Sequence, residues 1–162
     1  VVLISEGIEN SLVARDVILT TAQKVPQIAQ RMYEKLNITG SFAIKSCVGV
    51  NGLLGIPMPY KTHTVIILAD NDGDNVDVKR TIRETVAHFL KKGLAVKIAM
   101  PTATDGRKMD LNDVYVRPDG SRDPRKVTEV LCDAVPIKAI EELGPDTESL
   151  QKSLQRIQTK PL

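Results

Sequence analysis

The sequence predicts an α/β fold in which an open, mainly parallel sheet of about four strands is flanked by helices. Short apolar runs, which are typical of buried strands, alternate along the chain with segments of helical periodicity. The connections between the apolar runs are long enough to hold a crossover helix, as parallel strands require. The content of 42% hydrophobic and 26% charged residues is ordinary for a globular domain. Such an alternation places helices on both faces of the sheet.

The first half of the chain contains two predicted strands with helices between them. The second helix is indicated by Ile28, Met32 and Leu36, which recur at the spacing of one helix face, and Gly40 is expected to end it. Two glycines and two prolines disfavour regular structure in the segment after the second strand. The predicted strand, short helix, second helix, second strand and loop cover, in order, residues 1–5, 8 onward, 25–36, 42–48 and 51–60.

The second half continues the alternation. Val78, Ile82 and Val86 define the apolar face of a long helix, and Gly93 follows it at the position of a helix-ending glycine. Pro101 ends the strand after that helix. The predicted strand, helix, strand, long loop and final body helix cover, in order, residues 65–69, 76–92, 94–99, 102–125 and 126–134.

A chain of 162 residues suits one domain, because ~150 residues bury most of their apolar surface. We expect a domain over residues 1–140 and a polar tail over 141–162, in which Leu150, Leu154 and Ile157 give a short amphipathic helix that folds back on the body. A start at Val1 rather than Met suggests a piece of a longer protein, so further domains of that protein are expected partners.

Several protein classes receive no support from the sequence. There is no apolar stretch of the ~20 residues that a membrane span needs, and no basic segment of the signal-peptide kind precedes the first strand, so we expect a cytoplasmic protein. Cys47 and Cys132 lack the spacing of a zinc site and are expected to be buried free thiols. The net charge of +2 does not by itself indicate a nucleic-acid binder.

The most informative feature is a group of acids at predicted strand ends. Asp70 and Asp72 follow the apolar run 65–68, and Glu6 ends the first run. If these strands are neighbours in a parallel sheet, the three carboxylates converge at its carboxyl edge. Carboxylates held together repel each other unless a cation lies between them, and hard oxygen ligands suit Mg²⁺ or Mn²⁺. The simpler alternative is that Asp72 and Asp74 form a turn and a helix cap; the pattern as a whole favours metal binding, with Asp74 as a further ligand.

Three motifs in order resemble the Toprim domain found in primases, topoisomerases and related nucleases. The match is nearer to Toprim domains of plasmid and conjugation proteins, including primase-like and relaxase proteins. The resemblance covers roughly residues 1–135, and it implies a Rossmann-like fold. It is carried by EGIENSL at 6–12, ADNDG at 69–73, and Pro101 followed by KMDLND at 108–113.

The resemblance implies Mg²⁺-dependent phosphodiester chemistry on nucleic acid. It makes Glu6 the general acid or base and a metal ligand, beside Asp70 and Asp72. It also makes Asp110 of the third motif a further ligand. Asn112 is neutral, whereas the matching segment of related primases has alternating acids. An equally supported alternative is that Asp110 or Asn112 caps a short turn. DNA contact is expected mainly through the backbone, because the chain has only five aromatic residues. The expected phosphate-binding residues, which are basic and follow the fourth strand, are Arg107, Lys108, Arg122 and Arg125. Nucleotides are a second expected ligand.

Two other functions are also compatible with these motifs. One is a Toprim module of a conjugative relaxase that holds metal and DNA without catalysing a reaction. Another is a haloacid-dehalogenase-like phosphatase, which also uses an Asp-x-Asp-Gly motif, although that family opens its domain with the motif. A calcium loop of the EF-hand kind is excluded, because its sixth and twelfth positions hold Asn75 and Thr81. A topoisomerase needs a nucleophilic tyrosine, and Tyr60 and Tyr115 are expected only as loop residues.

Overall fold

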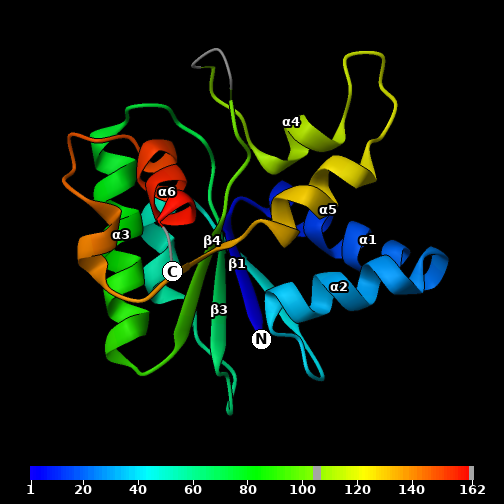
Figure 1. The fold of residues 1–162 in the computed structure, drawn as a ribbon, viewed down its shortest axis with the longest axis horizontal. Coiled ribbons are helices and arrows are strands. Elements are labelled where there is room, and N and C mark those ends of the chain that lie inside the picture. The colour runs from blue at the N-terminus through cyan, green and yellow to red at the C-terminus, as the bar shows by residue number, and fades with distance from the viewer. Residues whose placement is uncertain (104–106, 161–162) are drawn as a thin grey trace.

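A single five-stranded sheet organises the protein (Figure 1). The computed structural model describes residues 1–103 and 107–160. The strand order is β2-β1-β3-β4-β5, with β1 to β4 parallel and β5 antiparallel to β4. The strands β1 to β5 cover Val2–Glu6, Ala43–Cys47, Thr64–Leu68, Ala95–Ala99 and Val135–Ile137.

The predicted α/β class with a mainly parallel sheet is confirmed, but the expected strand number of four was wrong. Strand β5 was not predicted because it has only three residues, too few to show alternation, and Pro136 lies at its centre. Proline is tolerated there because β5 is an edge strand, in which the missing backbone N–H can face away from β4.

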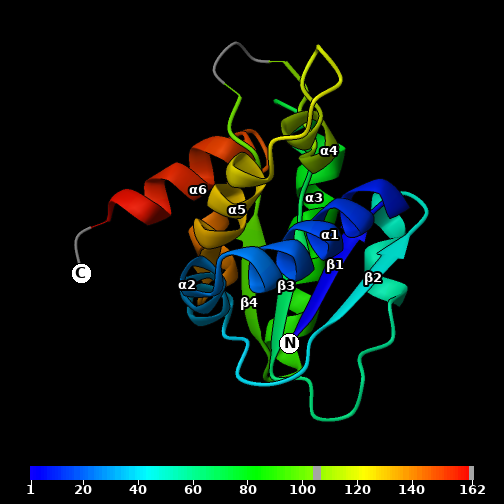
Figure 2. The ribbon, with the colours of Figure 1, turned by 90° about the vertical axis from the view of Figure 1, so that its right-hand side faces the viewer.

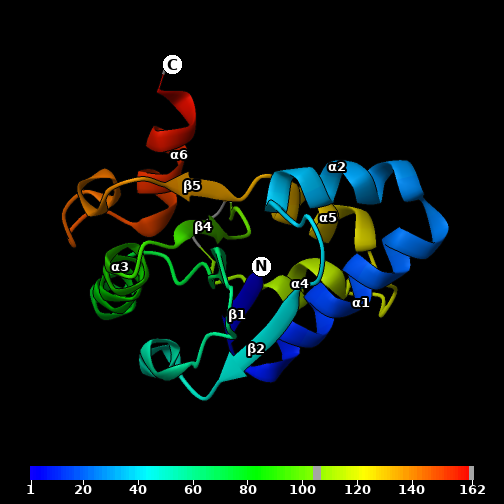
Figure 3. The ribbon, with the colours of Figure 1, turned by 90° about the horizontal axis from the view of Figure 1, so that it is seen from below.

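Helices cover both faces of the sheet in two groups, which Figure 3 shows on either side of the strands. The first group is α1, α2, α4 and α5, which cover Ile8–Lys24, Pro26–Leu36, Leu111–Tyr115 and Pro124–Cys132. The second group is α3, the 3-10 helices η1 and η2, and α6, which cover Val76–Lys91, Val50–Gly55, Ile140–Leu143 and Leu150–Thr159. The sheet therefore separates two hydrophobic cores.

Strand β3 lies at the centre of both cores. Val65 and Ile67 pack with the α3 group, whereas Ile66 and Leu68 pack with the α1 group, as the two-residue period of a strand requires. All five residues of β3 are buried. Burial of each such aliphatic side chain stabilises the fold by about 1.5–3 kcal/mol relative to exposure. The end of β3 is therefore held at a fixed place, and the residues that follow it start from there.

Three local predictions were wrong for identifiable reasons. Helix α2 ends at Asn37, which takes the left-handed conformation at φ 60°, so Gly40 is not its terminator. The predicted loop 51–60 begins within η1, where a Cβ on Gly52 would lie 2.8 Å from Cys47 Cβ, so this glycine allows close packing rather than disrupting structure. The predicted loop 102–125 contains α4, which begins at the cap residue Asp110. Residues 104–106 of that loop lie outside the described residues.

The tail is attached to the α3 face through α6. Leu150 and Leu154 are buried in the core of that face, as predicted from the apolar stripe, while the C-terminal end of α6 points away from the sheet in Figure 2. The buried Lys79 of α3 donates hydrogen bonds to Pro145 O at 2.8 Å, to Glu148 O, and to Ser153 Oγ at 2.9 Å. One ammonium group thus links α3 to the segment that leads into α6. The proposed domain boundary near residue 140 stays a prediction.

We expect Lys79→Met to lower the free energy of unfolding by about 2 kcal/mol, measured by urea denaturation. Methionine keeps the apolar stem of the side chain but removes the donor to two half-buried carbonyl oxygens and to the buried Ser153 hydroxyl, and an unmatched partner is the costly part of a lost hydrogen bond. The matched control is Lys91→Met at the exposed end of the same helix, which should change stability by no more than about 0.5 kcal/mol. Equal effects of the two substitutions would contradict the role given to Lys79.

Candidate functional site

The strand order places a topological switch between β1 and β3. The chain leaves β1 through α1 on one face of the sheet and leaves β3 through α3 on the other face. In open α/β sheets, the connections diverge at such a point and leave a crevice outside the carboxyl ends of the strands, where ligands bind. The pairing of Ser5 with Leu68 brings these two strand ends together.

The predicted acids lie around this point. Glu6 is the last residue of β1, and Asp70 follows β3 by two residues. The segment after β4 turns back toward them, because Asn71 and Met109 exchange backbone hydrogen bonds of 2.8 and 3.0 Å. Asp110 follows Met109 directly and so reaches the same edge. The assumption that β1 and β3 are neighbours in a parallel sheet is thus confirmed.

Asp70 is the electrostatic centre of the group. Its pKa is raised to about 7, first by burial and then by the negative charges of Asp110, Glu6 and Asp72. A hydrogen bond from Asn10 Nδ2 to Asp70 Oδ1, 2.7 Å long, works in the opposite direction but does not offset the repulsion. At neutral pH a carboxyl group with this pKa is only partly ionised, and a bound cation would compete with the proton.

Asn10 connects three parts of the site. Its side chain is buried, donates to Asp70, and accepts a hydrogen bond from the backbone of Asn112 at 3.3 Å. Helix α1, the end of β3 and helix α4 are therefore held together by one amide. The neutral residue Asn112 thus takes part in the site through its backbone N–H group, which donates to Asn10.

The remaining acids have protein partners of their own. Asp72 forms an ion pair with Lys108 at 3.6 Å. Asp110 accepts from the backbone of Asp113 at 2.7 Å in a capping box at the start of α4, so the capping alternative for this residue is confirmed. Burial raises its pKa first, and the charges of Asp113 and Glu9 add to the effect.

Within residues 1–103 and 107–160, no group of three or more His, Cys, Asp or Glu side chains is arranged to hold a metal ion.

Asp74 lies apart from this cluster. Its side chain is exposed, and its charge is not among those that raise the pKa of Asp70. The cap of α3 is Asn75, whose side chain accepts from Asp77 N and Val78 N. Neither Asp72 nor Asp74 fills that position.

The predicted phosphate-binding residues occupy two places. Arg107 and Lys108 are exposed on the segment that leads to Asp110, and Lys108 forms the ion pair with Asp72. Arg122 lies over the ring of Tyr115 at 5.7 Å, and Arg125 is exposed in the first turn of α5. Tyr115 itself belongs to α4 and is buried, with its hydroxyl donating to Asp16, so its prediction as a loop residue was wrong.

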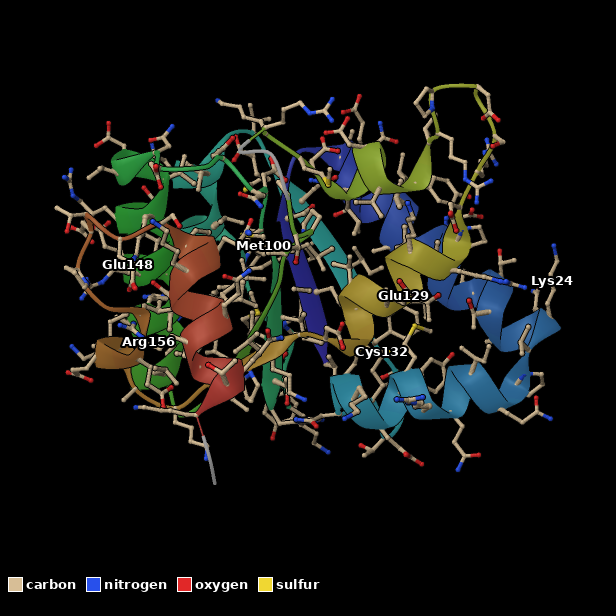
Figure 4. All side chains as sticks on the ribbon, turned by 45° about the horizontal axis from the view of Figure 1, so that its top comes forward. Lys24, Met100, Glu129, Cys132, Glu148 and Arg156 are labelled. Atoms are coloured by element: carbon tan, nitrogen blue, oxygen red, sulfur yellow. The ribbon has the colours of Figure 1, made fainter. Side chains whose placement is uncertain are left out.

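A cavity of about 470 Å³ lies beside the cluster rather than in it. Residues of α4, α5 and α6 line it, and Figure 4 shows two of its lining residues, Met100 between α6 and α5 and Glu129 on α5. None of the four carboxylates Glu6, Asp70, Asp72 and Asp110 is among the lining residues. The cavity therefore does not supply the acidic site with an enclosed chamber.

Sequence reasoning did not identify two of the residues around Asp70. Asn10 was part of the first motif, but nothing in the sequence separates a buried amide on α1 from an exposed one. Gln151 of α6 donates to Ala103 O and accepts from Asn71 Nδ2, across eighty positions of sequence. Only the tertiary arrangement shows that these amides adjoin the acids.

Comparison with known proteins gives no family for the chain. No protein-family model, curated protein or solved structure matches it. In the part of the chain that the structure describes, no helix has both the length and the apolar character needed to cross a membrane.

We expect Asp70→Asn to stabilise the protein at pH 8 by about 1–2 kcal/mol and to have little effect at pH 4. The folded-state pKa lies above the unfolded value, so at pH 4 the wild-type carboxyl is protonated in the folded state and only about half ionised in the unfolded state, and the two states differ little. The free energy of unfolding of the wild type therefore falls as pH rises from about 4 to about 7, because the carboxyl ionises more readily in the unfolded state. Urea denaturation at the two pH values measures the difference.

The matched control is Asp74→Asn, which removes an exposed carboxylate from the same loop. It should change stability by no more than about 0.5 kcal/mol at either pH. A gain for Asp70→Asn that is equal at both pH values would contradict the account of Asp70.

Proposed function

We propose that the chain is a Mg²⁺-dependent domain for phosphoryl or nucleotidyl transfer on nucleic acid, of the primase-like Toprim kind. The observation that carries this proposal is the convergence of Glu6, Asp72 and Asp110 on Asp70 at the switch point, where burial first and the charges of these neighbours second raise the pKa of Asp70 to about 7. Perturbed carboxyl groups at such a position are typical of functional sites. The resemblance of the three motifs supplies the reaction class.

The chemistry of the donor set fits Mg²⁺ or Mn²⁺. All four acids offer hard oxygen ligands, and a divalent cation relieves the repulsion that now raises the pKa of Asp70. Asp70, Asp72 and Asp110 are the residues that would hold the ion, with Glu6 beside them. When bound, the ion supplies charge neutralisation at a phosphate and orientation of the attacking group.

The residues of the chain have distinct proposed roles around that ion. Glu6 takes or gives the proton of the reacting group as a general acid or base. Asn10 fixes the orientation of Asp70 through its 2.7 Å hydrogen bond. Lys108 is exposed beside Asp72 and moves between that carboxylate and a substrate phosphate. Further phosphate contacts come from Arg107, Arg122 and Arg125, which are suited to backbone rather than base recognition.

The resemblance to plasmid and conjugation proteins suggests the wider role. We place the domain in a DNA-transfer or replication protein of that class, with DNA as the main ligand and nucleotides as a second one. A domain that binds metal and DNA without turnover, as in a relaxase, is the second candidate. It is favoured by the pairing of Asp72 with Lys108 and by the use of Asp110 as a helix cap.

Calorimetric titration with Mg²⁺ and Mn²⁺ tests the metal site directly. We expect the wild-type chain to bind at pH 8, where protons compete little for Asp70, and the double variant Asp70→Ala/Asp72→Ala to lose binding altogether. Asp77→Ala/Asp146→Ala, which removes an acidic pair elsewhere, is the matched control and should bind as wild type. Absence of wild-type binding, with DNA present as well, would contradict the proposal.

Glu6→Gln then separates the enzyme from the binding module. In assays for primer synthesis and nicking, it should abolish activity while leaving part of the metal affinity. If the wild-type chain binds metal and DNA but shows neither activity, the binding module is the better description.

A further inference from the structure

We propose that Gln151 of α6 is a positioning residue for the loop that carries Asp70 and Asp72. This inference rests on the proposed function, since it concerns the same site. It also assigns a purpose to the C-terminal tail, which none of the three motifs includes.

The first step concerns Asn71, which lies between the two acids. Its backbone exchanges two hydrogen bonds with Met109, and its side chain is buried at 3% exposure. The side-chain amide donates to Pro101 O at 3.0 Å and to Gln151 Oε1, while its Oδ1 accepts from Gly73 N at 3.3 Å. Side chains alternate along an extended segment, so Asp70 and Asp72 face away from the Asn71 amide. Holding Asn71 therefore holds the backbone from which both carboxylates extend.

The second step concerns the other end of this contact. Gln151 Oε1 accepts from Ala103 N at 3.2 Å, and Gln151 Nε2 donates to Ala103 O at 3.1 Å. These two bonds hold the amide group in one orientation, with Oε1 toward Asn71. A single side chain thus links the loop after β3 to the segment after β4, which carries Lys108 and Asp110.

The third step is that α6 is itself well anchored. Leu150 and Leu154 flank Gln151 in sequence and are buried in the core. Ser153 Oγ donates to Leu143 O at 2.7 Å and accepts from Lys79 Nζ. Because these contacts hold the first turn of the helix against α3 and η2, Gln151 presents its amide from a rigid element. Groups that hydrogen-bond a metal ligand directly change metal affinity by about 10–100-fold when removed, and Gln151 acts through Asn71 rather than on a ligand, so the lower end of this range is expected.

The test compares Gln151→Ala with Gln155→Ala, one turn further along the same helix. Gln155 is exposed, so its substitution removes the same residue type without the loop contacts. Gln151→Met, which keeps the length of the side chain, serves as a second variant should the alanine variant be poorly folded. Two readouts are taken at a temperature where thermal melts show each variant folded: calorimetric Mg²⁺ affinity, and hydrogen exchange of the Asn71 and Met109 amides.

We expect Gln151→Ala to weaken Mg²⁺ binding about tenfold and to speed exchange at Asn71 and Met109 about tenfold, with exchange in β3 unchanged. Gln155→Ala should change neither readout. A purely structural role would alter the melting temperature while leaving metal affinity and local exchange as in the wild type, and that result would overturn the proposal.

The two readouts also separate this inference from the proposed function. If the wild-type chain binds no Mg²⁺, the proposed function fails, and exchange alone decides the role of Gln151. Faster exchange confined to the two amides then supports positioning of the loop, and unchanged exchange overturns it.

Discussion

The parallel pairing of β1 with β3 is the constraint on which the rest of the structure depends. It joins a strand near the start of the chain to one that begins sixty residues later, and it sends the following helices to opposite faces of the sheet. Glu6 and Asp70 meet for this reason. The fold thereby concentrates negative charge at one edge, although the whole chain carries a net charge of only +2.

That concentration of charge needs compensation, and the surrounding residues supply it only in part. Asn10 donates to Asp70, Lys108 pairs with Asp72, and the N-terminus of α4 accommodates Asp110. The pKa of Asp70 nevertheless stays near 7. The buried amide of Asn10 on α1 and the half-buried amide of Gln151 on α6 hold the loop in place without adding charge.

Much of the fold was readable from the sequence because its strands are short apolar runs with clear ends, as in 65–68. Strand β5 was not, since three residues with a central proline carry no period. At the site, strand-end acids were predictable because parallel strands present their carboxyl ends at one edge. The local exposure of Asp74 was not predictable, and neither were the roles of the Asn10 and Gln151 amides, because only tertiary packing brings Asn10 to Asp70 and Gln151 to Asn71.

The central claim is that one divalent cation binds where β1 and β3 end. Paramagnetic broadening by substoichiometric Mn²⁺, followed residue by residue in amide NMR spectra, tests it most directly. The account predicts that signals of Gly7, Asn71, Gly73 and Asn112 broaden first, with Mg²⁺ reversing the effect by competition. Broadening centred on the exposed acids around Asp77 and Asp146, or none at the strand ends, would contradict it.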